Sequence, residues 1–272
     1  FPGETDPIGW GTEGNVQDPW SEETENNPPA DRRFIQSAGP FILEPGNVNN
    51  ITVGAVYGRS FSGNAVESVT VVKAADDKAQ NLFDNCFEIV DGPDQPDMAI
   101  VELDEELILT ISNTNSISNN FNETYHKKDP TIPDDILDGS GNLIPVPEED
   151  KFYNFQGYQV YQLVNSDVSP DQLNNPDFAR LIFQTDIEDN VAQIINYEFD
   201  PQIQLSIPVE KVDGTNEGVV HSFNIIEDAF AETDVNLINF KTYCFMVIAY
   251  GYNNFKPFDV QNGSGQPTPY LP

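Results

Sequence analysis

The sequence is poor in cysteine, tryptophan, histidine and basic residues, and it has no long apolar run. Its 272 residues include 2 Cys, 2 Trp, 2 His and only 12 Lys and Arg together. The two cysteines, Cys86 and Cys244, are too few for a disulfide scaffold and do not form a metal-ligand set. No apolar stretch is long enough to cross a bilayer, so direct membrane insertion is not expected.

The excess of acidic residues narrows the choice of partners. There are 45 Asp and Glu against the 12 basic residues, giving a formal net charge of −33. Such a chain is repelled by a phosphate backbone and by anionic membranes, which argues against nucleic-acid and membrane binding. Divalent cations and basic partners remain compatible with it, although acidity that only maintains solubility is the simpler interpretation. Aromatic residues make up 11% of the chain, so a folded core is expected despite the charge.

Two stretches have the alternation of β-strands, and the rest of the chain is organised around them. From Lys241 to Asn254 and from Phe152 to Val164, aromatic and β-branched residues recur with a period of two. Both faces of the later stretch are apolar. It is therefore predicted to be a central strand of a β-sandwich, with a further element covering each side.

The first 63 residues contain no strong core pattern. Residues 1–36 are rich in Gly, Pro, Asn and acidic residues and are predicted to be an extended loop segment. Residues 37–63 resemble a β-hairpin with a turn at Pro45-Gly46-Asn47, which we interpret as the terminal hairpin of an upstream β-domain. Because the chain starts at Phe1 and stops at Pro272, it is expected to be an excerpt or a processed piece of a longer protein.

One helix is predicted, over Asn64–Phe87. Asn64 and Glu67 have the spacing of a capping box, and apolar residues then recur every three or four positions up to Cys86. A single apolar stripe implies a single docking surface. The helix is therefore expected to pack on a β-element as a linker, with Leu82 and Phe83 largely buried. Residues 64–91 form this linking helix and joint.

Residues 92–272 are predicted to form the sandwich. Pro96 opens it, and further strands are expected at 98–103, 107–112, 179–187, 196–199, 202–209, 218–226 and within 255–270. A brief helical turn is predicted at Ser169-Pro170-Asp171. Residues 113–151 are polar, acidic and Pro-rich, and they form a long insertion between the second and third strands.

No catalytic motif is present, and the chain is predicted not to be an enzyme. His221 alternates with Val219 and Phe223 in a strand pattern typical of a structural histidine, and no G-x-S-x-G elbow accompanies it. The sharper hypothesis is calcium binding by Asp91, Asp94 and Asp97 in the joint, because hard cations need several oxygen ligands at short range. The alternative is that these residues occupy solvated turns, since they do not follow the calcium-loop pattern.

Trp10 and Trp20 lie in the first loop segment and are the only tryptophans. They are candidates for stacking on a sugar ring. The alternative is that they anchor the loop to a neighbouring core.

Several strands resemble those of a fibronectin type III domain. In that family an opening strand follows a proline, a GY-x-V-Y strand comes third and a Y-x-F-x-V-x-A strand comes sixth, as at Pro96, Gly157–Tyr161 and Tyr243–Ala249. Longer stretches resemble very large secreted or surface proteins of bacteria that use type IX secretion. They occur in collinear order over most of the chain, at residues 28–60, 73–98, 155–164, 173–187, 207–223 and 239–254. The resemblance implies export across both membranes and a non-catalytic region, and it supplies no catalytic residues.

The resemblance also bears on the two cysteines. It places Tyr243, Phe245, Val247 and Ala249 toward the core, so Cys244 is expected on the outer face with Met246 and Ile248. That face needs a cover, and the helix ending at Cys86 is the nearest candidate in sequence. A disulfide between Cys86 and Cys244 is then one hypothesis for an exported protein, and two buried free thiols are the other.

We therefore expect an all-β chain: a fibronectin type III-like β-sandwich with a long insertion, preceded by a β-hairpin and one packed linking helix. The expected function is a non-catalytic structural or interaction module of a large extracellular or cell-surface multidomain protein. The alternative is a carbohydrate- or protein-binding module accessory to a secreted hydrolase or adhesin. Expected partners are neighbouring domains of the same polypeptide, and envelope proteins or glycans. Calcium is the one cofactor considered.

Overall fold

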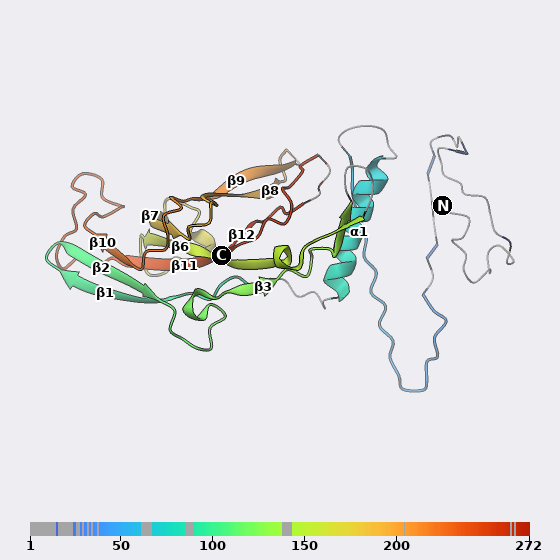
Figure 1. The fold of residues 1–272 in the computed structure, drawn as a ribbon, viewed down its shortest axis with the longest axis horizontal. Coiled ribbons are helices and arrows are strands. Elements are labelled where there is room, and N and C mark those ends of the chain that lie inside the picture. The colour runs from blue at the N-terminus through green and yellow to red at the C-terminus, as the bar shows by residue number, and fades with distance from the viewer. Residues whose placement is uncertain are drawn as a thin grey trace. The chain divides into compact units, whose positions relative to one another are not determined.

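The computed structural model describes residues 15, 24–25, 28, 30–31, 33, 35–36, 38–60, 67–84, 90–137, 143–203, 205–261, 263 and 265–272. It divides into two compact units, Phe1–Val53 and Gly54–Pro272. Figure 1 shows the course of the chain, which in the second unit is dominated by β-strands. The all-β class is thus confirmed. No helix among the described residues is long and apolar enough to cross a membrane.

The predicted hairpin over residues 37–63 is not formed as paired strands. The turn is present, with the Asn47 amide donating to the Glu44 carbonyl at 3.0 Å. However, residues 38–60 contain no strand, and apolar side chains such as Ile42 (92% exposed) and Val53 (78% exposed) lie in solvent. Two strands without a further strand or a packed face bury too little apolar surface to persist. The turn chemistry was therefore predicted correctly and the strand pairing was not.

The linking helix α1 spans Glu67–Asp84, and the predicted ends at residues 64–66 and 85–87 lie outside the described residues. Leu82 is half-buried, as is Ala79 one turn earlier. Phe83 is 47% exposed, so the prediction that both Leu82 and Phe83 are largely buried is wrong. Successive helical residues point about 100° apart, and the narrow apolar stripe directs only one of the two side chains to the docking side.

The second unit is built on two antiparallel sheets. A three-stranded sheet has the order β1-β2-β10, and a larger sheet has the order β12-β11-β6, with β3 and then β7 along the other edge of β6. The strands are β1 Asp97–Leu103, β2 Glu106–Ser112, β3 His126–Lys128, β6 Phe152–Leu163, β7 Ala179–Asp186, β10 Ser222–Ile225, β11 Cys244–Tyr252 and β12 Tyr270–Leu271. The strands predicted at 98–103, 107–112 and 179–187 are thus present. β10 covers only part of the predicted 218–226, and β12 begins at the last residue of the predicted 255–270.

The two sheets face each other across one apolar core. Leu109 of β2 and Phe223 of β10 meet Tyr158 of β6 and Val247 of β11, and all four are at most 7% exposed. Phe223 packs against Phe183 of β7 with ring centroids 4.8 Å apart, so β10 lies over β7. Alternating inward side chains from both sheets make this a β-sandwich.

The outer face of the larger sheet is covered as well, but not by α1. Cys244, Met246 and Ile248 pack against a cluster that includes Val168 and Leu173, from the connection between β6 and β7. That connection contains the predicted turn, a 3-10 helix over Pro170–Gln172 with a capping box from Ser169. The prediction that Cys244, Met246 and Ile248 lie on the outer face of β11 is thus confirmed. The prediction that the helix covers this face is wrong, because the connection between β6 and β7 occupies it.

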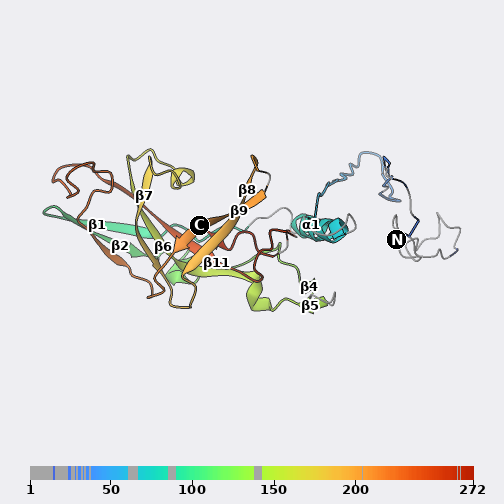
Figure 2. The ribbon, with the colours of Figure 1, turned by 90° about the horizontal axis from the view of Figure 1, so that it is seen from above.

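A second cover comes from the hairpin of β8 (Gln193–Asp200) and β9 (Leu205–Asp213). Its buried Ile194 and Val212 pack on Tyr250 and Tyr270. Figure 1 shows the resulting three layers, from β9 through β6 and β11 to β1. Figures 1 and 2 both place α1 beyond one end of these layers rather than over the face that carries Cys244.

The insertion at 113–151 contains local structure that the sequence did not reveal. Its described residues form a 3-10 helix η1 (Phe121–Glu123), strand β3, a small hairpin of β4 (Asp135–Leu137) and β5 (Leu143–Pro145), and a 3-10 helix η2 (Glu148–Lys151). Because β3 pairs with the start of β6, the insertion extends the larger sheet.

Candidate functional site

The joint, taken here as residues 90–97, leads into the sandwich and is hydrogen-bonded to the insertion. The Asp94 amide donates to Asn119 Oδ1 at 2.7 Å, and the Asn119 amide donates to Asp94 Oδ2 at 2.8 Å. The Asn119 side chain also donates to the Gly92 carbonyl at 2.9 Å. We call this set of contacts the joint clasp. It uses the Asp94 carboxylate as an acceptor for a backbone amide, in the manner of a turn rather than of a metal ligand.

Two further contacts fix the same segment. The Tyr125 hydroxyl donates to the Asp91 carbonyl at 2.6 Å. A Cβ atom placed on Gly92 would lie 1.9 Å from the carbonyl oxygen of Pro272, so only glycine permits this approach. Residues more than 100 positions apart therefore meet at the joint.

The three predicted calcium ligands are not brought together. Asp94 belongs to the joint clasp, and Asp97 begins β1 opposite Ser112. Within the described part of the chain, no group of three His, Cys, Asp or Glu residues has the arrangement of a metal site. The geometry thus gives the calcium hypothesis no support, and it favours the alternative of carboxylates in structured turns.

The remaining predicted site residues are only partly placed. Trp10, Trp20 and Cys86 lie outside the described residues. Cys244 is half-buried, beside Met246 and Ile248 as expected, and it is bonded to no cysteine among the described residues. The alternatives of a disulfide and of two free thiols stay predictions, because one of the two sulfurs is not described.

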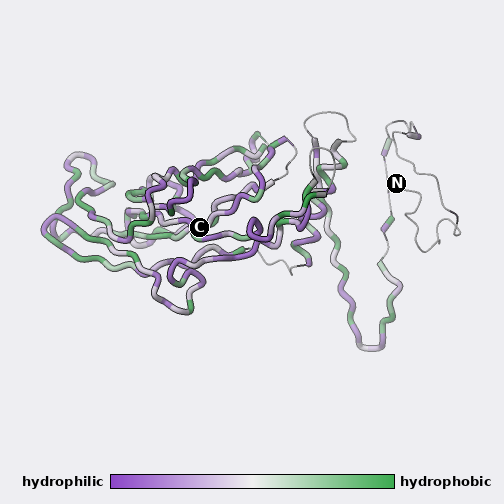
Figure 3. Tube along the Cα trace, viewed as in Figure 1, coloured by the Kyte–Doolittle hydropathy of each residue, from purple (hydrophilic) through white to green (hydrophobic). Residues whose placement is uncertain are grey.

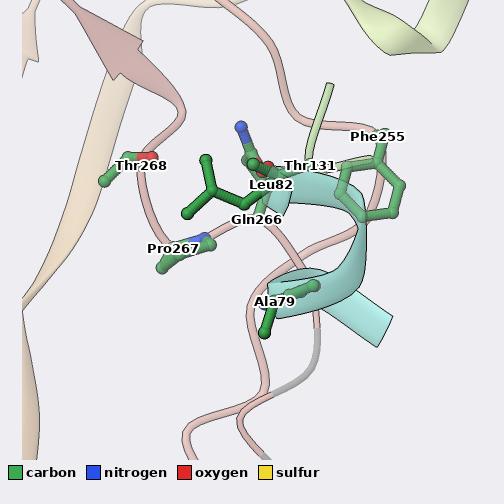
Figure 4. A pocket seen from close by; sticks show the side chains of 9 residues that line it. Ala79, Leu82, Thr131, Phe255, Gln266, Pro267 and Thr268 are labelled. Atoms are coloured by element: carbon green, nitrogen blue, oxygen red, sulfur yellow. The ribbon is translucent and has the colours of Figure 1, made fainter. Parts of the chain in front are cut away.

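A pocket of about 260 Å³ lies where α1 meets the loops around β12. It is lined by Lys78, Ala79, Leu82, Thr131, Phe255, Gly265, Gln266, Pro267 and Thr268. Figure 4 shows the Phe255 ring on one side and Pro267 and Thr268 on another, with Leu82 of α1 between them. One aromatic face, two threonines and an amide could hold a small polar molecule.

A buried polar cluster supports this pocket. Gln266 donates its amide to the Tyr153 hydroxyl and, at 3.4 Å, to Asp129. The Tyr153 hydroxyl donates in turn to the Thr268 carbonyl at 2.5 Å, and burial raises the pKa of this tyrosine to about 12. Asp129, 5% exposed, accepts from the amide and the hydroxyl of Thr131 at 2.8 and 2.7 Å. All of these groups are satisfied by one another, so they fix loop geometry.

Lys78 brings a cation to the rim of the pocket. Burial lowers the pKa of its ammonium, and the nearby charge of Asp129 opposes that shift. The pocket therefore combines a cation, an aromatic ring and hydrogen-bonding groups.

His221 belongs to a second cluster that sequence reasoning missed. Its Nε2 lies 2.5 Å from Glu123 Oε1, and the Tyr158 hydroxyl donates to the same oxygen at 2.7 Å. Asn113 donates to the Tyr158 hydroxyl. Burial is the main cause of the raised pKa of Tyr158, so this phenol stays protonated and donates. The cluster ties the insertion to β6 and to the segment before β10, which agrees with a structural role for His221.

Glu123 reaches this position through strained backbone. Its φ is 61° and that of Asn122 is 51°, in the left-handed region that few side chains adopt. Nearby in sequence, the fully buried side chain of Asn120 has no hydrogen-bond partner for either amide atom. The only sequence signal for this loop was its richness in Asn, the residue that best tolerates positive φ after glycine.

Asp186 is another buried carboxylate with a structural role. It is fully buried, and the Asn216 amide donates to both of its oxygens at 3.1 Å. Burial raises the pKa of this carboxyl, and backbone hydrogen bonds oppose the shift. A Cβ on Gly214 would lie 2.4 Å from the carboxylate, so the loop before β10 closes directly over it.

Comparisons with known proteins do not assign the chain to a family. No protein-family model matches it, and no similar protein is found among curated proteins or solved structures.

Proposed function

We propose that this chain is a non-catalytic structural and interaction module of a large extracellular or cell-surface multidomain protein. The observation that carries the proposal is the joint clasp. A module that sets the orientation of its neighbours needs its entry segment fixed to its own core. Here the insertion, through Asn119 and Tyr125, holds the backbone of Gly92, Asp94 and Asp91.

The buried polar groups support the same proposal. Asp129 accepts from Gln266, Asp186 accepts from Asn216, and the half-buried Glu123 accepts from Tyr158, so each carboxylate is engaged by a donor distant in the sequence. Enzymes leave a reactive group exposed to a cleft with its pKa matched to the reaction. These carboxylates instead join loops to one another.

The strand arrangement supports the family part of the proposal. The order β1-β2-β10 facing β12-β11-β6-β7 is compatible with the resemblance to fibronectin type III domains drawn from the sequence. Secretion by the type IX route, and placement outside the cell, rest on the sequence resemblance alone. Neighbouring domains of the same polypeptide are then the expected partners.

The test is whether the joint is rigid and whether the clasp makes it so. Hydrogen–deuterium exchange of peptides covering residues 90–97 should show protection similar to that of β6. Asn119→Ala removes two side-chain hydrogen bonds and should raise exchange at the joint about tenfold or more. Asn115→Ala is the matched control, because the Asn115 side chain accepts only from the amide of Ile117 in its own loop.

Two outcomes would end the proposal. The first is a joint that already exchanges in the wild-type protein as fast as the exposed turn at Glu44–Asn47. The second is an Asn119→Ala variant whose joint is as protected as that of Asn115→Ala.

The second candidate function is a carbohydrate- or protein-binding module, and the pocket beside α1 favours it. Phe255 offers a ring for stacking, and Lys78 and Thr268 offer polar groups. On a glycan array, binding lost in Phe255→Ala but kept in Phe199→Ala would support this function, since Phe199 is an exposed strand residue at 65% exposure. Loss on replacing Trp10 or Trp20 would locate the sugar in the first loop segment instead.

A further inference from the structure

The pocket between α1 and the loops around β12 is lined largely by apolar groups. Ala79 and Leu82 belong to α1, and Phe255 and Pro267 come from the loops. Figure 3 shows hydrophobic and hydrophilic residues interspersed along α1, so this helix brings both kinds of side chain to the pocket. Its volume of about 260 Å³ lies just below the range of about 300–1,000 Å³ that is usual for drug-sized ligands. The pocket therefore suits a molecule with a single ring.

The Lys78 ammonium lines this pocket without a carboxylate partner. No described residue forms an ion pair with it, and Asp129 acts on it only as a nearby charge. The carboxylate of Asp129 is itself engaged by Thr131 and Gln266. Burial lowers the pKa of the ammonium, because an unpaired cation is held partly out of water. The free protein thus carries an uncompensated positive charge at the pocket.

Two other lysines leave water together with a carboxylate. The Lys151 side chain is 6% exposed and pairs with Asp134 at 2.6 Å, and the Lys211 side chain is 13% exposed and pairs with Glu198 at 2.6 Å. The chain has 45 acidic residues, yet none of the described residues that line the pocket is acidic. An anion that enters the pocket would give Lys78 the partner that the other two lysines have within the chain.

We infer that this pocket binds a small organic monoanion, a carboxylate carried on a single ring, with the carboxylate on the Lys78 ammonium and the ring against Phe255. The ammonium supplies a charge-assisted hydrogen bond, and the aromatic face and Leu82 cover the ring. The inference deepens the second candidate function and rests on it, because it names the charge and shape of the ligand that the binding module takes.

The electrostatics of the chain limit the ligand to one negative charge. A single ammonium neutralises one charge, and the formal net charge of −33 repels any excess. A phosphate dianion, a nucleotide or a sulfated polysaccharide would therefore bring charge that nothing in the pocket compensates. A neutral ring would leave the Lys78 ammonium as unpaired as it is in the free protein.

The first probe is phenylacetate, with phenylacetamide as a neutral counterpart of nearly the same shape. In a titration followed by ¹H–¹⁵N NMR, phenylacetate should shift the amide signals of Ala79 and Thr268 saturably, with a dissociation constant of about 10 mM or below. Phenylacetamide should bind at least about fivefold more weakly, because hydrogen bonds to a charged group are stronger than those to a neutral one. This comparison uses the wild-type chain and needs no variant.

Lys78→Met removes the charge and keeps an apolar stem of similar length. It should weaken phenylacetate binding at least about fivefold and abolish the preference over phenylacetamide. Lys73→Met is the matched control, since it changes the net charge equally at an exposed position of the same helix, and it should change binding less than about twofold. The melting temperature of Lys78→Met should equal or exceed that of the wild type, because an unpaired, partly buried cation is lost.

Glucuronate and its neutral counterpart glucose distinguish the source of the carboxylate. Tighter binding of glucuronate than of phenylacetate would assign the pocket to a sugar acid, and the reverse order would assign it to an acid with an apolar ring. Both orders support the inference if each carboxylate binds more tightly than its neutral counterpart and depends on Lys78.

Three results would overturn the inference. The first is the absence of saturable shifts with either carboxylate up to about 50 mM. The second is that each carboxylate binds no more tightly than its neutral counterpart; if glucose then binds, the second candidate function stands and only the inference fails. The third is that Lys73→Met weakens binding as much as Lys78→Met, which would make the effect one of overall charge.

Discussion

Asp228 offers the sharpest test of how this sandwich is stabilised. It lies in the connection between β10 and β11, and its side chain is 3% exposed. It accepts from Lys241 Nζ at 2.5 Å, from Gln162 Nε2 of β6 at 2.7 Å and from the Phe230 amide at 3.0 Å. Removing the carboxylate therefore leaves several donors without an acceptor.

The loss in free energy of unfolding that Asp228→Ala causes can be estimated for each donor in turn. Lys241 is 48% exposed, so its ammonium regains water. Gln162 is 3% exposed, and its amide and that of Phe230 lose a charged acceptor in a poorly solvated place. Each unsatisfied buried donor costs about 1–3 kcal/mol, so Asp228→Ala should lower the free energy of unfolding by about 3 kcal/mol. Asp234→Ala, in the same connection but exposed and bonded only to Asn236, should cost less than about 0.5 kcal/mol.

The pH dependence gives an independent check. Burial opposes ionisation of Asp228, but hydrogen bonds from Lys241, Phe230 and Gln162 outweigh it, and the pKa of the carboxyl is lowered from its ordinary 3.8. A lowered pKa means that the stabilisation is present above the unfolded-state pKa and is lost as the pH falls through the folded-state value. The difference between wild type and Asp228→Ala should thus be full at pH 7 and shrink below about pH 4.

Urea denaturation at a series of pH values measures both effects. The reasoning fails if Asp228→Ala and Asp234→Ala have equal free energies of unfolding at pH 7. It fails equally if the gap between wild type and Asp228→Ala widens on acidification.

Four further predictions concern the core, the close approach of β6 to β7, the two cysteines and the joint. Leu109→Ala should lower the free energy of unfolding by about 3–5 kcal/mol in urea, because a fully buried side chain leaves a cavity. Gly157→Ala should cost more than about 2 kcal/mol, since its Cβ would lie 2.1 Å from the Thr185 carbonyl of β7, and a normal melting curve would contradict that crowding. Thiol titration of the unfolded, unreduced protein should find two reactive groups if Cys86 and Cys244 are free thiols and none if they are bonded. Calcium should leave the melting temperature unchanged relative to chelator, because the joint aspartates are not gathered; a clear rise that Asp94→Asn removes would restore the metal hypothesis.

The sequence by itself determined where most strands of the two facing sheets lie and which residues of each strand share a face. The alternation in Tyr243–Tyr250 put Val247 and Ala249 on one face and Cys244 on the other, and the family resemblance assigned the first of these faces to the core, as the structure has it. It also located the helix and the turn capped by Ser169. These features follow from local geometry, since a period of two or 3.6 and the chemistry of a cap involve only residues close together in the chain.

Only the tertiary structure decided what each apolar face meets. The outer face of β11 is covered by the connection between β6 and β7, and α1 docks elsewhere, because periodicity records that a face is apolar and not which element reaches it. The sequence likewise did not determine which acidic residues form structural hydrogen bonds. Asp94 meets Asn119 and Glu123 meets His221 across long sequence separations. With 45 acidic residues in the chain, nothing local marks the few that a distant donor will engage.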